Sequence, residues 1–232
     1  MGDVVYGILL WVAGGLVAAV ALILTGVVDL QTGELGELSP GAVALSLLSG
    51  WIGLAGWPIV ASYRKGRRSL AADYGLRITW IDLAWGVATG FACLAISVAG
   101  NVAWLILSDE EAPDNAEFLP SNPGLLGGLV LVLLVAVGTP VVEELFFRGL
   151  FLRSVARRWG PAAGVVVSSV VFGLFHATGD SVAEAAFIVG VTTVYGVLLS
   201  LVATATGRLG APIVAHMVVN GVGVTATLLG VV

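Results

Sequence analysis

The sequence predicts an all-α, polytopic bundle of about seven transmembrane helices, and three observations carry that prediction. The 232 residues are 58% hydrophobic and only 11% charged, with a mean hydropathy of +1.04, whereas a soluble domain is about 25% charged. Apolar runs of about 20 residues, the length that crosses a bilayer as a helix, recur along the chain. The charged residues between these runs segregate by sign from one side to the other.

Seven apolar runs are separated by polar breaks, and each is expected to form a helix because lipid offers the backbone no hydrogen-bond partners. None alternates with the period of two that is typical of barrel strands. The first run lacks a preceding basic segment and exceeds a signal peptide's apolar core, so we expect it to remain as a span. The runs cover approximately residues 4–28, 41–63, 80–107, 123–147, 161–178, 184–203 and 211–231. An eighth span within the long third run is the alternative.

The charged residues predict the topology of these spans. With seven alternating spans and a cytoplasmic N-terminus, all basic residues fall on or near one face, which the positive-inside rule assigns to the cytoplasm. The basic residues are Arg64, Lys65, Arg67, Arg68 and Arg77 between spans two and three, Arg148, Arg153, Arg157 and Arg158 between spans four and five, and Arg208 between spans six and seven. The opposite face receives Asp29, Glu34, Glu37, Asp109, Glu110, Glu111, Asp114, Glu117, Asp180 and Glu184.

Composition and charge also exclude several classes of protein. The hydrophobic content excludes a disordered chain, and the single cysteine, Cys93, excludes a disulfide scaffold. A net charge of −5 argues against nucleic acid as a partner. Because no repeat, low-complexity tract or long linker divides the chain, we expect residues 1–232 to form a single integral membrane domain.

Few ionisable side chains lie inside the apolar runs, and such groups are by default functional candidates. Near the end of the fourth run, Glu144 and Arg148 are spaced to form an ion pair along a helix. Glu143 is rotated from Glu144 by about 100° and faces a different neighbour. If the fourth and fifth runs form a hairpin that turns at 159–160, Glu143 and His176 lie at equal height. A carboxylate and an imidazole can then face each other.

The two histidines of the chain complete the set of candidates. Phe172 and His176 share one helix face in the fifth run, and His216 and Asn220 share one face in the seventh. Each residue alone has a structural explanation, such as a hydrogen-bonded core histidine or a polar contact between helices. Their joint occurrence, with both histidines on separate apolar helices, favours a functional site.

Three motifs occur in the order and setting of the signature motifs of a known family, and residues 120–231 resemble the CAAX-protease and bacteriocin-processing (CPBP) family of intramembrane proteases. The resemblance implies a helical bundle with a membrane-embedded site. It also implies hydrolysis of a peptide bond near a substrate's C-terminus in the prenyl-protein branch, and roles in immunity or as scaffolds in other members. The motifs are Glu143-Glu144-x-x-x-Arg148, Phe172-x-x-x-His176 and His216-x-x-x-Asn220.

Amide hydrolysis requires an activated water, stabilisation of the tetrahedral oxyanion and a proton for the leaving amine. We expect Glu143 to act as general base and His176 to hold and polarise the same water. His216 and Asn220, one turn apart, are expected to donate hydrogen bonds to the oxyanion. The family resemblance supports this division of roles. The supporting residues are Glu144, Arg148 and Phe172.

Three alternatives stay open. Glu143, His176 and His216 are a plausible ligand set for catalytic zinc, although the chain has no His-Glu-x-x-His pair, and we favour chemistry without a cofactor. In the second alternative, the chain is a non-enzymatic member of the same family that acts in immunity or as a scaffold. A transporter would use intramembrane charges as an ion path, but it predicts an internal repeat that the sequence lacks.

The expected partners are the lipid bilayer and a membrane-associated peptide or protein substrate, and the sequence leaves open whether that substrate is prenylated. We expect an integral multi-pass protein of a prokaryotic plasma membrane. Its N-terminus and the opening of its active site are expected to face the cytoplasm.

Overall fold

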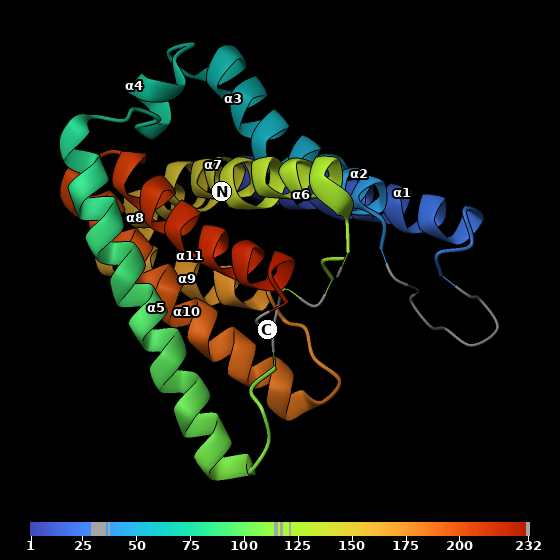
Figure 1. Ribbon diagram of the computed structural model, residues 1–232. Coiled ribbons are helices and arrows are strands. Elements are labelled where there is room, and N and C mark those ends of the chain that lie inside the picture. Colours follow the sequence, from blue (N-terminus) through green and yellow to red (C-terminus); the bar gives the residue numbers. More distant parts are fainter. Residues whose placement is uncertain (29–35, 37, 114–115, 117, 121, 231–232) are drawn as a thin grey trace.

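The computed structural model describes residues 1–28, 36, 38–113, 116, 118–120 and 122–230, and this part of the chain is helical without a β-strand (Figure 1). The loop acids Asp29, Glu34, Glu37, Asp114 and Glu117 lie outside the described residues. The helices are α1 (Gly2–Leu24), α2 (Pro40–Trp51), α3 (Trp57–Lys65), α4 (Leu70–Tyr74), α5 (Trp80–Ser108), α6 (Gly124–Leu131), α7 (Thr139–Glu144), α8 (Leu152–Trp159), α9 (Pro161–Leu174), α10 (Val182–Thr206) and α11 (Gly210–Leu228). Three π-helical segments are η1 (Ile52–Gly56), η2 (Val132–Gly138) and η3 (Leu145–Phe151).

The apolar runs form helices as the sequence predicts. Six continuous helices in the described chain are long and apolar enough to cross a membrane, and α9 is a seventh, shorter apolar helix of 14 residues. The third run forms the single helix α5, without the break that an eighth span would need. The polytopic helical bundle is therefore confirmed.

The fourth span is longer than predicted, and the expected position of Arg148 between the fourth and fifth spans is wrong. The helix expected over 123–147 continues from Gly124 to Trp159, a total of 36 residues. Nothing in the sequence Leu145–Leu152 breaks a helix, so the chain turns only at Gly160, where φ is +90°, before Pro161 starts α9. Arg148 consequently lies within the helix and is 1% exposed.

Two π-helical segments interrupt this long helix on either side of α7. A π-turn carries an extra residue and leaves backbone groups unpaired, and such turns are frequent at functional sites. In η2 the N–H of Thr139 donates to the carbonyl of Leu134, five residues back. The short α7, which carries both glutamates, is thus bounded by η2 and η3.

A buried hydrophobic core surrounds η3 and draws side chains from most of the bundle. It includes Val4 of α1, Leu54 of η1, Phe146 of η3, Phe172 of α9 and Ile213 of α11. Helices α5 and α11 approach each other closely, because a Cβ atom at Gly86 would meet Val214 at 2.4 Å. These contacts hold α7, α9 and α11 together around one point.

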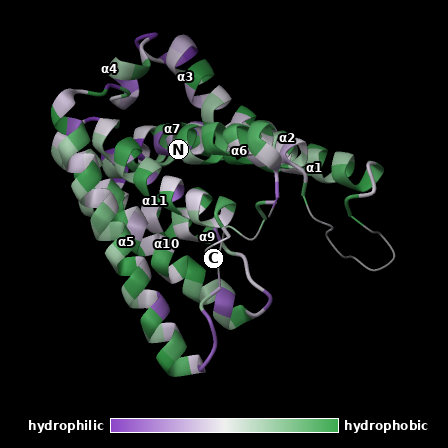
Figure 2. Cartoon of the chain, in the orientation of Figure 1, coloured by the Kyte–Doolittle hydropathy of each residue, from purple (hydrophilic) through white to green (hydrophobic). Residues whose placement is uncertain are grey.

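Hydrophilic residues gather at two ends of the bundle, around α3 and α4 and at the far end of α5 with the start of α10 (Figure 2). Apolar helices separate the two ends, as expected for a protein that crosses a bilayer. At the basic end, Arg208 binds Asp82 at the start of α5, with Nη2 and Oδ1 2.8 Å apart. Asp82 also completes a capping box with Thr79.

Candidate active site

Glu143 and Glu144 are the last two residues of α7, and their side chains diverge. Adjacent residues on a helix point about 100° apart. The Glu144 side chain is fully buried in the bundle, whereas 16% of the Glu143 side chain is exposed. One carboxylate therefore faces the core and the other faces a more open position.

Glu144 holds two partners through a single oxygen. Its Oε1 lies 2.8 Å from Arg148 Nη1, one turn along the same helix, and 3.0 Å from His216 Nδ1 on α11. Arg148 Nη2 donates in addition to the carbonyl of Gly196 on α10. The Glu144–Arg148 pair was predicted from its spacing. The contact of Glu144 with His216 was not, because the sequence carries no register between helices so far apart.

Glu143 lies between the two histidines. Its Oε2 is 4.0 Å from His176 Nε2 and 3.9 Å from His216 Nε2. This carboxylate oxygen is buried and has no hydrogen-bond partner. The hairpin of α8 and α9 brings Glu143 and His176 to equal height, because its turn lies at the expected Gly160.

His176 is oriented by its own backbone. Its Nδ1 lies 2.8 Å from the carbonyl of Phe172, and because a carbonyl only accepts, this nitrogen carries the hydrogen. In the neutral ring, Nε2 then has the free lone pair and faces Glu143. The orientation of both histidines thus places Nε2 toward the same carboxylate oxygen.

Phe172 packs at the centre of the site. Its ring lies 4.6 Å from the His176 ring and 5.8 Å from the His216 ring, and Arg148 Cζ lies 4.3 Å from its centroid. Phe172 is 2% exposed. It fills the space between the two histidines and the buried ion pair, and thereby limits the movement of all three.

Asn220 is only partly free. Its Nδ2 donates to the carbonyl of Val135 in η2 at 3.0 Å, so that one amide hydrogen is used within the bundle. An asparagine amide has two hydrogens, and the second has no acceptor within the described residues. Asn220 therefore keeps one hydrogen and its Oδ1 for a ligand.

A hydrogen bond between α8 and the α10–α11 loop helps to bring Glu143 and His216 to the same level, although they lie at different distances from the nearest loop. Arg153 Nη2 donates to the carbonyl of Gly207 at 3.0 Å. Glu143 lies ten residues before Arg153, and His216 lies nine residues after Gly207. The loop therefore contacts the side of α8 and not its end, and the tip of the α8–α9 hairpin extends beyond the loop. As a result, Glu143 and His216 lie at the same level.

The fit of a zinc ion follows from these distances. Zinc binds oxygen and nitrogen at about 2.0–2.2 Å, so tetrahedral ligand atoms lie about 3.4 Å apart. The Glu143 oxygen and the histidine nitrogens are more widely spaced, at 3.9 and 4.0 Å. Within the described residues, no group of three His, Cys, Asp or Glu side chains is arranged to hold a metal ion.

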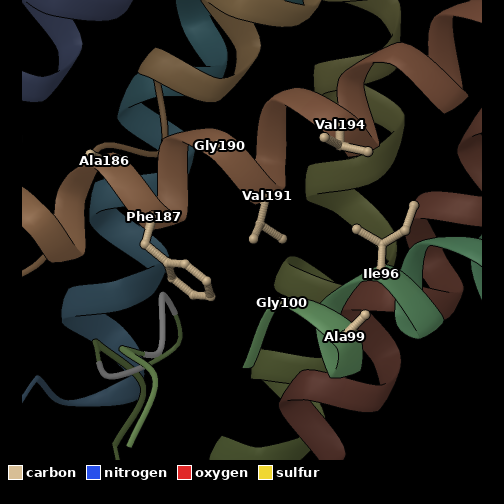
Figure 3. A pocket seen from close by; sticks show the side chains of 8 residues that line it. All are labelled: Ile96, Ala99, Gly100, Ala186, Phe187, Gly190, Val191 and Val194. Carbon is tan, nitrogen blue, oxygen red and sulfur yellow. The ribbon is translucent and has the colours of Figure 1, made fainter. Parts of the chain in front are cut away.

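An apolar pocket of about 480 Å³ lies elsewhere, between α5 and α10 (Figure 3). Ile96 and Ala99 of α5 face Phe187, Val191 and Val194 of α10 across it. Every lining side chain is apolar, and none belongs to the candidate site. The pocket therefore has no group that can take part in hydrolysis.

One further polar side chain lies beside the predicted residues. Thr139 is four residues before Glu143, is 8% exposed, and its Oγ1 is buried without a hydrogen-bond partner. Thr139 is not among the site residues predicted from the sequence. The signal was a hydroxyl at helical spacing from Glu143 within an apolar run.

Comparison with known proteins identifies a family for this region. Residues 125–222 match the family described as type II CAAX prenyl endopeptidase Rce1-like, and every site residue above lies within the match. No curated protein and no solved structure matches the chain. The predicted resemblance to CAAX proteases is confirmed, because residues 125–222 of this chain are similar to the Rce1-like family of type II CAAX prenyl endopeptidases.

Proposed function

We propose that the protein is an intramembrane endopeptidase of the glutamate type, which hydrolyses a peptide bond in a membrane-associated peptide or protein. One observation carries the proposal. The Glu143 carboxylate oxygen is buried, has no hydrogen-bond partner, and lies about equally far from two imidazole nitrogens. The match of residues 125–222 to a family of endopeptidases supports this use of the site.

The spacing suits a water molecule as the shared partner. A water about 2.8 Å from each of two atoms fits between atoms that lie 4.0 Å apart. Such a water donates one hydrogen to Glu143 and one to Nε2 of His176. Glu143 then takes the proton as the water oxygen attacks the carbonyl carbon of the peptide. The proton passes to the leaving amine when the carbon–nitrogen bond breaks, and the other product is a carboxylic acid.

A water donates only two hydrogen bonds, so it cannot also donate to Nε2 of His216 once it binds Glu143 and His176. In its protonated form His216 donates through Nε2 instead, while its Nδ1–H stays on Glu144. We assign His216 and the second hydrogen of Asn220 to the oxyanion. Glu144, Arg148 and Phe172 hold this arrangement and do not touch the substrate.

The wider setting of the site is part of the same proposal. We infer from the positive-inside rule that the end of the bundle with the basic residues around α3, α4 and α8 faces the cytoplasm. The site opens there or laterally to lipid, and a prenylated peptide is the first substrate to test. The second function, a non-enzymatic immunity or scaffold protein, would leave the same geometry without turnover.

The proposal is tested with purified protein in liposomes and a fluorogenic peptide that ends in farnesylated Cys-Val-Ile-Met. We expect the wild type to cleave it and both Glu143→Gln and His176→Gln to reduce kcat by about 10²–10⁴-fold. The matched control is Glu184→Gln, the same change in an exposed carboxylate that caps α10. An unprenylated copy of the peptide reports whether the lipid is needed.

Loss of cleavage in the control variant, or full cleavage in Glu143→Gln, contradicts the proposal. Cleavage by neither the wild type nor any variant favours the scaffold function. Incubation with a chelator tests the zinc alternative: activity that falls and returns with added zinc would replace the proposed mechanism. Unchanged activity supports catalysis by the side chains of the site without a metal ion.

A further inference from the structure

Thr139 differs from the other threonines in the helices. Its Oγ1 is the one buried hydroxyl in the described chain that has no hydrogen-bond partner. Threonine in a helix usually donates to the carbonyl four residues back. Thr192, Thr204 and Thr227 follow this pattern, with distances of 2.6, 2.7 and 3.1 Å. The Thr139 hydroxyl is therefore exceptional for a local reason.

The usual acceptor of Thr139 is already occupied. That acceptor is the carbonyl of Val135, which receives the Asn220 amide at 3.0 Å. The carbonyl is available to Asn220 because the Thr139 N–H donates to Leu134 instead. The next possible donor on the helix, Pro140, has no N–H. The π-turn and the proline thus free a carbonyl for Asn220 and leave the Thr139 hydroxyl without a partner.

The position of this hydroxyl follows from the helix. A helical carbonyl points along the axis toward the residue four positions ahead, so the Asn220 amide on Val135 lies beside Thr139. Thr139 is in turn one α-helical turn before Glu143, on the same face. The hydroxyl is therefore placed between the Asn220 amide and the carboxylate that faces the two histidines.

We propose that Thr139 is a further catalytic residue, whose hydroxyl donates a hydrogen bond to the oxygen of the scissile carbonyl as it becomes an oxyanion. The proposal deepens the proposed function and depends on it. Thr139 and the second amide hydrogen of Asn220 form a pair of donors on one side of the attacked carbon. The hydroxyl keeps its proton throughout, and the oxyanion returns its electron pair when the carbon–nitrogen bond breaks.

A catalytic role and a purely structural role of the Thr139 hydroxyl predict opposite effects of Thr139→Val on the melting temperature. A buried hydroxyl without a partner destabilises the folded state, and a methyl group of the same shape removes that penalty. Thr139→Val should therefore melt at or above the temperature of the wild type. If the hydroxyl served only the fold, the same change would lower the melting temperature.

The test measures kcat, KM and the melting temperature of Thr139→Val and Thr139→Ser in liposomes, with the farnesylated peptide. We expect Thr139→Val to lose about 10²-fold in kcat, as for one oxyanion donor, with KM little changed. Thr139→Ser keeps the hydroxyl and should restore most of the rate. The matched control is Thr192→Val, which removes a buried hydroxyl outside the site and should leave kcat unchanged.

Three outcomes overturn the inference. Wild-type kcat in Thr139→Val does so, as does a loss of kcat that accompanies a lower melting temperature, or a loss that Thr139→Ser does not restore. If Glu143→Gln is inactive while Thr139→Val matches the wild type, the inference fails and the proposed function stands. If the wild type itself does not cleave the peptide, both fail together.

Discussion

Two clusters of acidic and basic side chains lie in this bundle, and they differ in how completely their hydrogen bonds are satisfied. At the start of α5, the Asp82 carboxylate accepts from Arg208 through both oxygens and from Thr79 through the backbone N–H and the hydroxyl. At the candidate site, Oε2 of Glu143 and of Glu144 and Nε of Arg148 are buried without partners. Both clusters contain buried carboxylates, but only the Asp82 carboxylate has hydrogen-bond partners for both of its oxygens.

The difference separates structure from function. A buried polar group without a partner costs about 1–3 kcal/mol, and a bundle with 58% hydrophobic residues could have filled these positions with apolar side chains. The Asp82 cluster stabilises the junction of α5 with the α10–α11 loop. Under the proposed function, the polar atoms without partners at the candidate site find their hydrogen bonds when a ligand binds.

The largest stability effect is expected from Arg148→Ala. The change leaves Glu144 as an uncompensated buried charge, since both members of the pair are fully buried, and it should lower the free energy of unfolding by about 3–5 kcal/mol. Denaturant unfolding in detergent measures it. The matched control is Arg158→Ala, an exposed residue on the same long helix. Equal effects of the two variants would remove the distinction between the clusters.

A direct comparison of the two clusters uses one substitution in each. Asp82→Asn weakens a satisfied ion pair and should cost about 1–3 kcal/mol without a change in kcat. Glu143→Gln removes a carboxylate that has no partner and should leave the free energy of unfolding unchanged or raise it. The same unfolding measurement serves both. A less stable Glu143→Gln beside an unaffected Asp82→Asn would reverse the comparison.

The smallest effect on stability is expected at Asp73, a hydrogen-bonded carboxylate outside the membrane-spanning helices. The hydrogen bond from Ser62 chiefly holds the pKa of Asp73 below its usual value, with help from Arg67. Because the folded state has the lower pKa, this stabilisation is present above the unfolded pKa of about 3.9 and disappears as the pH falls through the folded value. Asp73→Asn should therefore melt slightly below the wild type at pH 7, and the difference should shrink as the pH falls below about 3.9. A difference that persists in acid contradicts this origin.

Local patterns in the sequence predicted the helices well and the contacts between them poorly. Run length and hydropathy gave the apolar helices, and the hairpin turn brought Glu143 to His176 as expected. The predicted fourth span ends before Arg148, because this arginine was counted with the basic residues between spans four and five. Its ion pair with the buried Glu144 instead allows it inside the helix. The contact of His216 with Glu144 depends on how far the α10–α11 loop lies from the hairpin tip, and no local spacing encodes that distance.

The π-turns explain why the contact of Asn220 with Val135 was not predicted. Counting by 3.6 residues assumes a regular helix, but η2 and η3 each add a residue to a turn. The use of the Val135 carbonyl by Asn220 follows from one such turn. Proline at position 140 was a visible signal, since it removes an N–H from the helix.

The short helix α9 has a consequence for the membrane itself. Its 14 residues extend about 21 Å, whereas the hydrocarbon core is about 30 Å thick. Lipids next to a short element thin and draw their headgroups inward to match it. His176 follows the end of α9, so we expect such thinning to lie beside the candidate site. We expect an amphipathic substrate approaching from that side to cross less hydrocarbon than beside the longer helices of the bundle.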